Sequence, residues 1–243
     1  MYVLVALLLL IGVYGIYEYK RTVAFIEKGK LLSQQAIPYT TTANHGTATM
    51  LVVGDSTAVG VGSSREQSVP ARVSIALGVS VENNARSGAS IHDVRLQIQD
   101  ASQKHYDLIL IQAGANDIMS LRSYSEIENE AQQLLRDARM HSDRVVLLTA
   151  GDIGKAYIWP FPLNHILSHR TKKVRTIMQS LADNHDVVYV DLYTLPDPFA
   201  TDPERYYAAD FLHLSADGYG VWAEHVLNAI QKQWPELYEE KRD

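Results

Sequence analysis

Short apolar runs alternate with helical patterns along most of this chain, and this alternation constrains the fold more than any other feature. Each run is four or five residues long, and most consist almost entirely of Val, Ile and Leu. The runs are residues 50–53, 79–83, 108–111, 144–148 and 187–190. Each run is followed by a segment whose apolar residues have helical spacing; these segments are 69–77, 91–101, 124–140, 164–184 and 216–231. This order predicts an α/β fold, a three-layer sandwich whose five parallel strands have helices on both faces.

In such a sheet, ligands bind at the carboxyl ends of the strands, beside the point where the strand order reverses. Polar residues directly after a strand are therefore candidate site residues. Ser56 follows the first run, in the block Gly-Asp-Ser-Thr at 54–57. A serine on a strand-to-helix turn is exposed, and the first helical N–H groups there can point at an oxyanion. Helix capping explains an Asp-Ser pair at this place equally well.

Two further candidates follow the second and third runs. Gly88 can bring its backbone N–H close to a ligand because it has no side chain, although a turn glycine needs no such role. Asn116, in the block Gly-Ala-Asn-Asp at 114–117, can donate its side-chain amide to an oxyanion, although an Asx-turn is the usual use of such a pair. Gly60 and Gly62 are weak evidence for a phosphate loop, because the rest of that pattern is missing.

The last candidates precede the final helical pattern, in the block Asp-Phe-Leu-His-Leu-Ser at 210–215. A carboxylate three residues before a histidine can accept its ring N–H and leave the other ring nitrogen free as a base. His213 is therefore predicted to be a general base that Asp210 orients. The chain contains no cysteine, which excludes a thiolate nucleophile, so Ser56 is the best-placed nucleophile.

Taken together and in this order, the four blocks resemble those of the SGNH hydrolases, the superfamily of GDSL-like esterases and lipases. That superfamily is named for a Ser, a Gly, an Asn and a His, which Ser56, Gly88, Asn116 and His213 match. The resemblance covers roughly residues 51–230. Thr57 replaces the usual Leu of the first block, and an apolar segment precedes the domain, but neither departure removes a reacting group.

The resemblance implies a flavodoxin-like version of the sandwich and a serine esterase that needs no metal or organic cofactor. His213 would take the proton from Ser56 as its hydroxyl attacks an ester carbonyl, and Asp210 would orient His213. The backbone N–H groups of Ser56 and Gly88 and the side chain of Asn116 would hold the oxyanion. The expected substrate is a carboxylic ester, as for an esterase or lysophospholipase.

Two alternatives to this function stay open. One is a carbohydrate O-acetyl esterase or acyltransferase that acts on envelope polymers. The other is a membrane-tethered binding domain without turnover, although the intact reacting residues argue against it. Substrate residues are not identified, but the loop 151–162 carries three aromatic residues at the expected site edge. These aromatics would line an acyl pocket or a sugar platform, or pack the loop onto the domain. The loop 195–209 is also long enough to shape the pocket.

Residues 1–17 carry no charged side chain, and seventeen helical residues span about 25 Å, slightly less than the roughly 30 Å hydrocarbon core of a bilayer. Tyrosines at 14, 17 and 19 suit a membrane interface at the end of this segment, and a Lys-Arg pair lies just beyond them. We expect a membrane anchor; a cleaved signal peptide and a buried soluble helix are the alternatives. No basic residue precedes the apolar run and no clear Ala-x-Ala site follows it, which argues against a signal peptide. The segment has no polar face, and a buried helix of a soluble protein usually shows one, which argues against the soluble helix.

The chain is therefore predicted to comprise a membrane helix at 1–20, a linker at 21–48, a catalytic domain at 49–232 and a polar tail at 233–243. The basic residues after the anchor favour a cytoplasmic domain on a bacterial-type cell membrane by the positive-inside rule, but exported enzymes of this size also begin with an apolar segment. The net charge of -6 at pH 7 provides no basic surface, so nucleic acid is not an expected partner.

Overall fold

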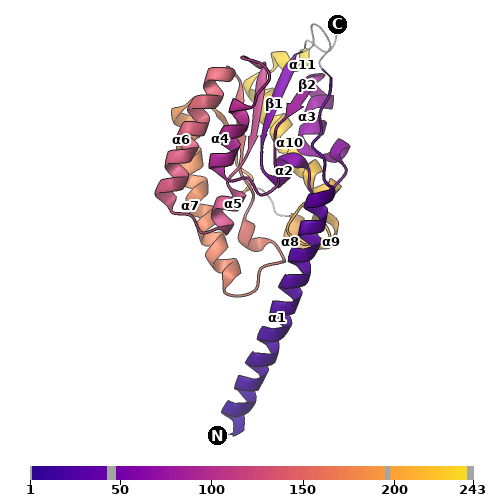
Figure 1. Cartoon of the computed structure of the whole chain (residues 1–243), viewed down its shortest axis with the longest axis vertical. Coiled ribbons are helices and arrows are strands. Elements are labelled where there is room, and N and C mark those ends of the chain that lie inside the picture. Colours follow the sequence, from indigo (N-terminus) through magenta and orange to yellow (C-terminus); the bar gives the residue numbers. More distant parts are fainter. Residues whose placement is uncertain (1, 43–47, 195–197, 240–243) are drawn as a thin grey trace.

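A five-stranded parallel sheet forms the centre of the protein in a computed structural model, which describes residues 2–42, 48–194 and 198–239. The strand order is β2-β1-β3-β4-β5 (Figure 1). The strands are β1 (Thr49–Gly54), β2 (Ser80–Asn83), β3 (Leu108–Gln112), β4 (Val145–Leu148) and β5 (Val188–Val190). This order is that of the flavodoxin-like sandwich, so the predicted fold class is confirmed.

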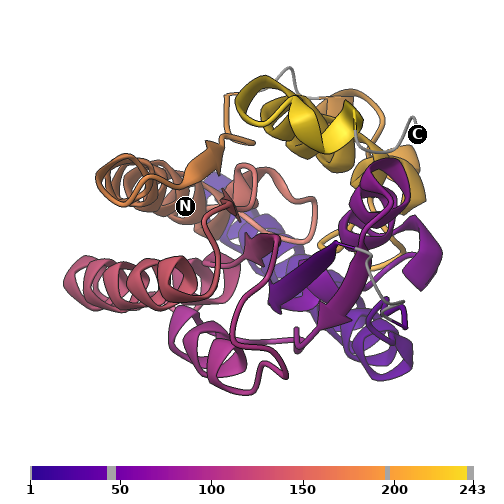
Figure 2. The same ribbon diagram turned by 90° about the horizontal axis from the view of Figure 1, so that it is seen from above.

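Helices cover both faces of the sheet, as the view in Figure 2 shows. One face carries α4 (Ile91–Gln99), α6 (Tyr124–His141) and α7 (Leu163–Asn184), and the other carries α3 (Val69–Leu77) and α10 (Ala216–Gln233). Four of these helices begin at a serine whose side chain accepts an N–H of the first turn: Ser68, Ser90, Ser123 and Ser215.

Short helices fill the connections. They are α2 (Ser56–Val59), α5 (Ala115–Met119), α8 (Pro198–Thr201), α9 (Pro203–Tyr206) and α11 (Glu236–Glu239), with 3-10 turns at Arg65–Gln67 and Ile153–Lys155. Most of them lie at the edge where the strands end. The sequence patterns did not predict them as separate elements, because four or five residues are too few to show a helical period.

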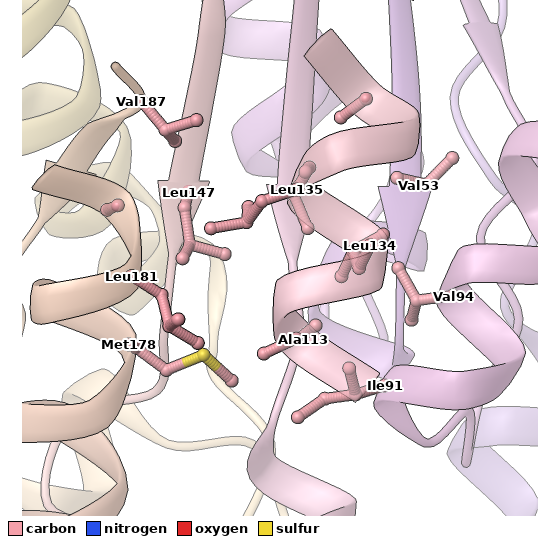
Figure 3. Close-up of a cluster of buried hydrophobic side chains, with 14 of the residues drawn as sticks. Val53, Ile91, Val94, Ala113, Leu134, Leu135, Leu147, Met178, Leu181 and Val187 are labelled. Carbon is pink, nitrogen blue, oxygen red and sulfur yellow. The ribbon is translucent and has the colours of Figure 1, made fainter. Parts of the chain in front are cut away.

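Alternate residues of the central strands enter two separate cores. Leu51 and Val53 of β1 belong to the core on the side of α4, α6 and α7, and Figure 3 shows Val53 there, whereas Met50 and Val52 belong to the core on the side of α3 and α10. Both sets are fully buried. A strand buried on both faces needs apolar residues at every position, which explains the continuous apolar runs in the sequence.

The N-terminal helix α1 runs from Tyr2 to Gln35 without a break and projects far from the domain at its N-terminal end (Figure 1). Residues 2–17 are all exposed, so the interpretation as a buried soluble helix is wrong for them. The expected linker over 21–48 is helical as far as Gln35 because this part of α1 packs against the domain. Beyond it, Thr41 donates its N–H to the carbonyl of Val81 (3.0 Å) and lies beside β2.

The C-terminal segment also differs from the expected tail. Leu237, in α11, is buried in the core beneath α10, and the Glu236 carboxylate lies 3.2 Å from the Arg144 guanidinium. The apolar Leu237 side chain explains why this otherwise polar segment returns to the domain.

Candidate active site

The four sequence blocks meet at one edge of the sheet. The strand β1 pairs with β2 on one side and β3 on the other, so the chain reverses direction across the sheet at β1. Ser56, Gly88 and Asn116 follow β1, β2 and β3, and His213 precedes α10. All four line a single cleft, as the sequence patterns predicted for the carboxyl ends of parallel strands.

Ser56 is the first residue of α2, directly behind its capping residue. The Asp55 carboxylate accepts hydrogen bonds from the backbone N–H of Thr57 (2.9 Å) and from its hydroxyl (2.8 Å). Helix capping therefore does not occupy the serine here. Asp55 caps the helix, and the Ser56 hydroxyl is left to face the cleft. The threonine that departs from the usual Leu contributes its hydroxyl to this cap.

The Ser56 hydroxyl lies in line with an imidazole and a carboxylate. Its Oγ is 3.0 Å from Nε2 of His213, although 157 residues separate the two positions, and Nδ1 of His213 is 2.5 Å from Oδ2 of Asp210. The other oxygen of Asp210 accepts the backbone N–H groups of Leu212 (3.1 Å) and His213 (3.0 Å). Asp210 is fully buried, so this carboxylate is fixed within its own turn.

Two buried carboxyl groups at the site have pKa values that are shifted in opposite directions. Burial alone would raise the pKa of Asp210, but the hydrogen bond and charge of His213 and the two backbone N–H groups outweigh it, so this pKa is lowered. Burial raises the pKa of Asp55 to about 6, and the hydrogen bonds from Thr57 offset only part of that effect. Asp210 therefore stays ionised at neutral pH and can stabilise a protonated imidazole.

Gly62, which the sequence patterns linked only weakly to phosphate binding, packs against the histidine loop instead. Its φ of +99° favours glycine, and a Cβ there would lie 2.5 Å from the carbonyl oxygen of Leu214 and 3.2 Å from Cβ of His213. Gly62 thus permits the loop after α2 to touch the loop that carries the imidazole. A Gly-Val-Gly sequence shortly after the serine is a signal for such close contact.

The loops that carry Gly88 and Asn116 are in direct contact at the cleft. Gly88 has a φ of +80°, and no atom lies within 4 Å of where its Cβ would be, so its backbone is open to the cleft. The Asn116 side-chain amide donates to the carbonyl of Ala89 (3.0 Å), which leaves its second N–H for a ligand. Asp117 accepts the N–H of Ile91 (2.9 Å) and thereby holds the two loops together, a role that the sequence patterns did not assign.

The cleft wall is mostly apolar, but its residues are not the predicted aromatics. In the loop 151–162, Tyr157 packs on Phe211 (5.6 Å between ring centroids), Trp159 packs on the core and Phe161 is 72% exposed. The interpretation as packing residues therefore holds for Tyr157 and Trp159. The wall includes Met119, Ile153, Phe199, Tyr207, Leu212 and Trp222. Two of these belong to the loop 195–209, of which 195–197 lie outside the described residues.

Among the residues whose placement is described, no group of three or more His, Asp or Glu side chains is arranged to hold a metal ion. The groups that the structure brings together at this edge are a hydroxyl, an imidazole and a carboxylate in line, beside amide donors. Such a set can deprotonate the hydroxyl as it attacks a carbonyl carbon.

Solved structures of other proteins share this architecture. An α/β hydrolase named LAE5, from the metagenome of Lake Arreo, superposes with a TM-score of 0.61 at 19% identity, over 75% of this chain and 94% of that one. A lipase/acylhydrolase from Enterococcus faecalis superposes with a TM-score of 0.58 at 19% identity, over 77% and 97%. At these identities the likeness shows a shared hydrolase fold.

Sequence comparison then identifies the family. Residues 52–221 match the GDSL-like Lipase/Acylhydrolase family, so the chain belongs to it, as the four blocks predicted. A similar protein is the GDSL-like esterase Rv1075c of Mycobacterium tuberculosis, which is 28% identical over 194 residues. That match covers 75% of this chain and 61% of the mycobacterial protein. The apolar helix α1 lies outside the segment that matches the family.

Proposed function

We propose that this protein is a serine esterase that hydrolyses carboxylic esters through an acyl-enzyme. The observation that carries the proposal is the 3.0 Å contact between Ser56 Oγ and His213 Nε2, in line with the buried Asp210. His213 takes the proton as Ser56 attacks, and Asp210 stabilises the imidazolium that forms. His213 then gives this proton to the alcohol that leaves as the acyl-enzyme forms. The neutral His213 next activates a water molecule, which releases the acid and regenerates the serine. Ser56 and His213 are the residues that change bonding or protonation in this mechanism, and Asp210 stays ionised throughout.

The oxyanion of each tetrahedral intermediate is bound by three donors in this proposal. They are the backbone N–H groups of Ser56 and Gly88 and the free side-chain N–H of Asn116. The positive φ of Gly88 and the Asn116–Ala89 hydrogen bond support this assignment, because they fix both donors before a substrate arrives. Preorganised donors of this kind each contribute about 10²–10³ in turnover in other enzymes.

The apolar wall of the cleft supports an acyl group as the part of the substrate that enters it. Phe199, Leu212 and Trp222 line the cleft near His213, and Met119 and Ile153 line it on the side of β3 and β4. An apolar wall of this kind is complementary to a hydrocarbon chain. A second candidate is an O-acetyl esterase, because an acetyl xylan esterase from Geobacillus stearothermophilus has the same fold (TM-score 0.57, 19% identity).

Labelling with a fluorophosphonate probe tests the nucleophile. We expect the wild-type protein and a Ser64→Ala control to be labelled and to hydrolyse p-nitrophenyl esters, because Ser64 is exposed and its hydroxyl bonds to the side chain of Gln67, away from the cleft residues. Ser56→Ala should be folded, unlabelled and inactive. Retained turnover in Ser56→Ala would refute the nucleophile assignment, and an unlabelled wild-type protein would favour the binding-domain alternative.

A substrate panel separates the two enzyme candidates. It contains p-nitrophenyl esters of increasing acyl length and acetylated oligosaccharides. We expect kcat/KM to rise with acyl length as the chain covers more of the apolar wall. Activity confined to acetyl groups on sugars would favour the O-acetyl esterase, and transfer of the acyl group to an added alcohol in preference to water would identify an acyltransferase.

The proposal includes a membrane anchor formed by the first half of α1. Within the described residues α1 is long and apolar enough to cross a membrane, a property that signal sequences share. The support for an anchor is its continuity: the same helix that projects from the domain continues to Gln35 against the site. Full-length protein should remain in membranes washed with alkaline carbonate and keep its N-terminal segment by intact mass. Release of a shortened form would refute the anchor.

A further inference from the structure

The inner half of α1 lies on the catalytic edge of the domain. From Glu18 onward the helix contacts the loops that surround the site, and Glu18 and Gly29 are its two buried residues. The Thr22 hydroxyl donates to the carbonyl of Ile158 (3.3 Å), and the Arg21 guanidinium lies over the ring of Tyr157, 5.5 Å from its centroid. The inner half of the projecting helix is therefore packed against the loop 151–162, which borders the active site.

Gly29 is the point of closest approach to the catalytic residues. A Cβ built on Gly29 would lie 2.8 Å from Oδ2 of Asp210 and 3.6 Å from its Cγ. Oδ2 is the oxygen that Nδ1 of His213 contacts at 2.5 Å. No side chain fits between the helix and this carboxylate, so the bare backbone of α1 covers Asp210 and contributes to its complete burial.

The neighbouring turns of α1 also touch the site. Phe25 packs on Phe211 with 5.1 Å between ring centroids, and Phe211 is the residue after Asp210, held at a φ of +54°. A non-glycine residue in this conformation is strained and needs contacts to hold it. Ser33 lines the cleft itself. Because Phe25, Gly29 and Ser33 are spaced four residues apart, they share one face of the helix.

We propose that this face of α1, formed by Phe25, Gly29 and Ser33, is a positioning element of the active site. It excludes water from Asp210 and holds the carboxylate against His213, with Phe25 bracing the turn that carries it. Charge interactions are stronger where water is excluded, so the covered carboxylate supports the imidazolium better than an open one. The inference depends on the proposed roles of Ser56, His213 and Asp210. It gives the inner half of α1, and not its exposed apolar half, a part in positioning the catalytic groups.

Gly29→Ala in the full-length, detergent-solubilised protein tests the proposal, with Gly15→Ala as its matched control. The same substitution is made in the same helix, but no atom lies within 4 Å of a Cβ at Gly15, so only Gly29→Ala pushes on Asp210. We expect kcat of Gly29→Ala to fall at least about tenfold with little change in KM, because small misplacements of catalytic groups have effects of this size. Gly15→Ala should match the wild type.

A spectroscopic measurement separates positioning from general damage. The proton between Nδ1 of His213 and Asp210 should give a far-downfield NMR signal in the wild type and in Gly15→Ala. In Gly29→Ala this signal should shift or disappear through exchange with water. Wild-type kcat together with an unchanged signal in Gly29→Ala would overturn the proposal. If Ser56→Ala is inactive but Gly29→Ala is fully active, only the proposed role of α1 is overturned. If Ser56→Ala is active, the proposed function itself is overturned.

A second variant decides the matter if Gly29→Ala does not fold. Phe25→Leu removes the ring that packs on Phe211 and leaves Gly29 in place. Its control is Tyr19→Leu, since Tyr19 is on the same helix and is 71% exposed. We expect Phe25→Leu to lower kcat several-fold without raising KM, and Tyr19→Leu to be unchanged. Equal kcat in these two variants would overturn the proposal.

Discussion

The buried Asp55 carboxyl should make the stability of this protein depend on pH in a direction opposite to that of most acidic groups. Its side chain is 2% exposed, and burial raises its pKa from 3.8 to about 6. The folded protein thus holds this proton more tightly than the unfolded chain does. Stability is therefore lost as the pH rises from about 4 to 6, and the loss persists above pH 6.

The shift of about 2 pKa units corresponds to about 3 kcal/mol in the free energy of unfolding. Asp55→Asn removes the titration but keeps an amide oxygen that can accept both hydrogen bonds from Thr57. All other titrating groups are shared by the variant and the wild type, so they cancel in the difference between the two proteins.

Thermal unfolding of both proteins from pH 4 to pH 8 measures this difference. For a chain of this size, about 3 kcal/mol corresponds to roughly 6–12 °C in Tm. The Tm of Asp55→Asn relative to the wild type should rise by that amount between pH 4 and pH 7. Asp143→Asn, at an exposed carboxylate, is the control and should show no such trend. A Tm difference for Asp55→Asn that is constant across this range would refute the reasoning.

Three further predictions concern turnover. Asn116→Ala should lower kcat by about 10²–10³ with a much smaller change in KM; steady-state kinetics check this, and a purely KM effect would make Asn116 a substrate-binding residue. Asp210→Asn should lower kcat by about 10⁴ while the acyl-length preference stays unchanged, since only the support of His213 is lost; a change in preference would contradict that role. Ser33→Phe should lower kcat/KM for long acyl esters more than for acetyl esters, because Ser33 lines the cleft; equal losses across the panel would contradict it.

The sheet could be predicted from the sequence because its central strands β1, β3 and β4 are buried on both faces and are therefore continuously apolar. The five apolar runs match β1 to β5 to within one or two residues at each end, and the helix 69–77 has the same bounds as α3. Short helices such as α2 and α5 were missed because they lack a full helical period. The role of the aromatic loop 151–162 was left open because it depends on which neighbours the loop meets, and the sequence contains no information on those contacts.

The sequence by itself determined which chemical groups are available and at which end of the strands they lie. Ser56, Asn116 and His213 each stand in a block after a strand or before a helix, and parallel strands must bring their carboxyl ends to one edge. The tertiary structure alone decided the 3.0 Å contact across 157 residues and the cover that Gly29 places on Asp210. Both depend on how whole helices pack against the sheet, and such long-range packing is not encoded in any short block of residues.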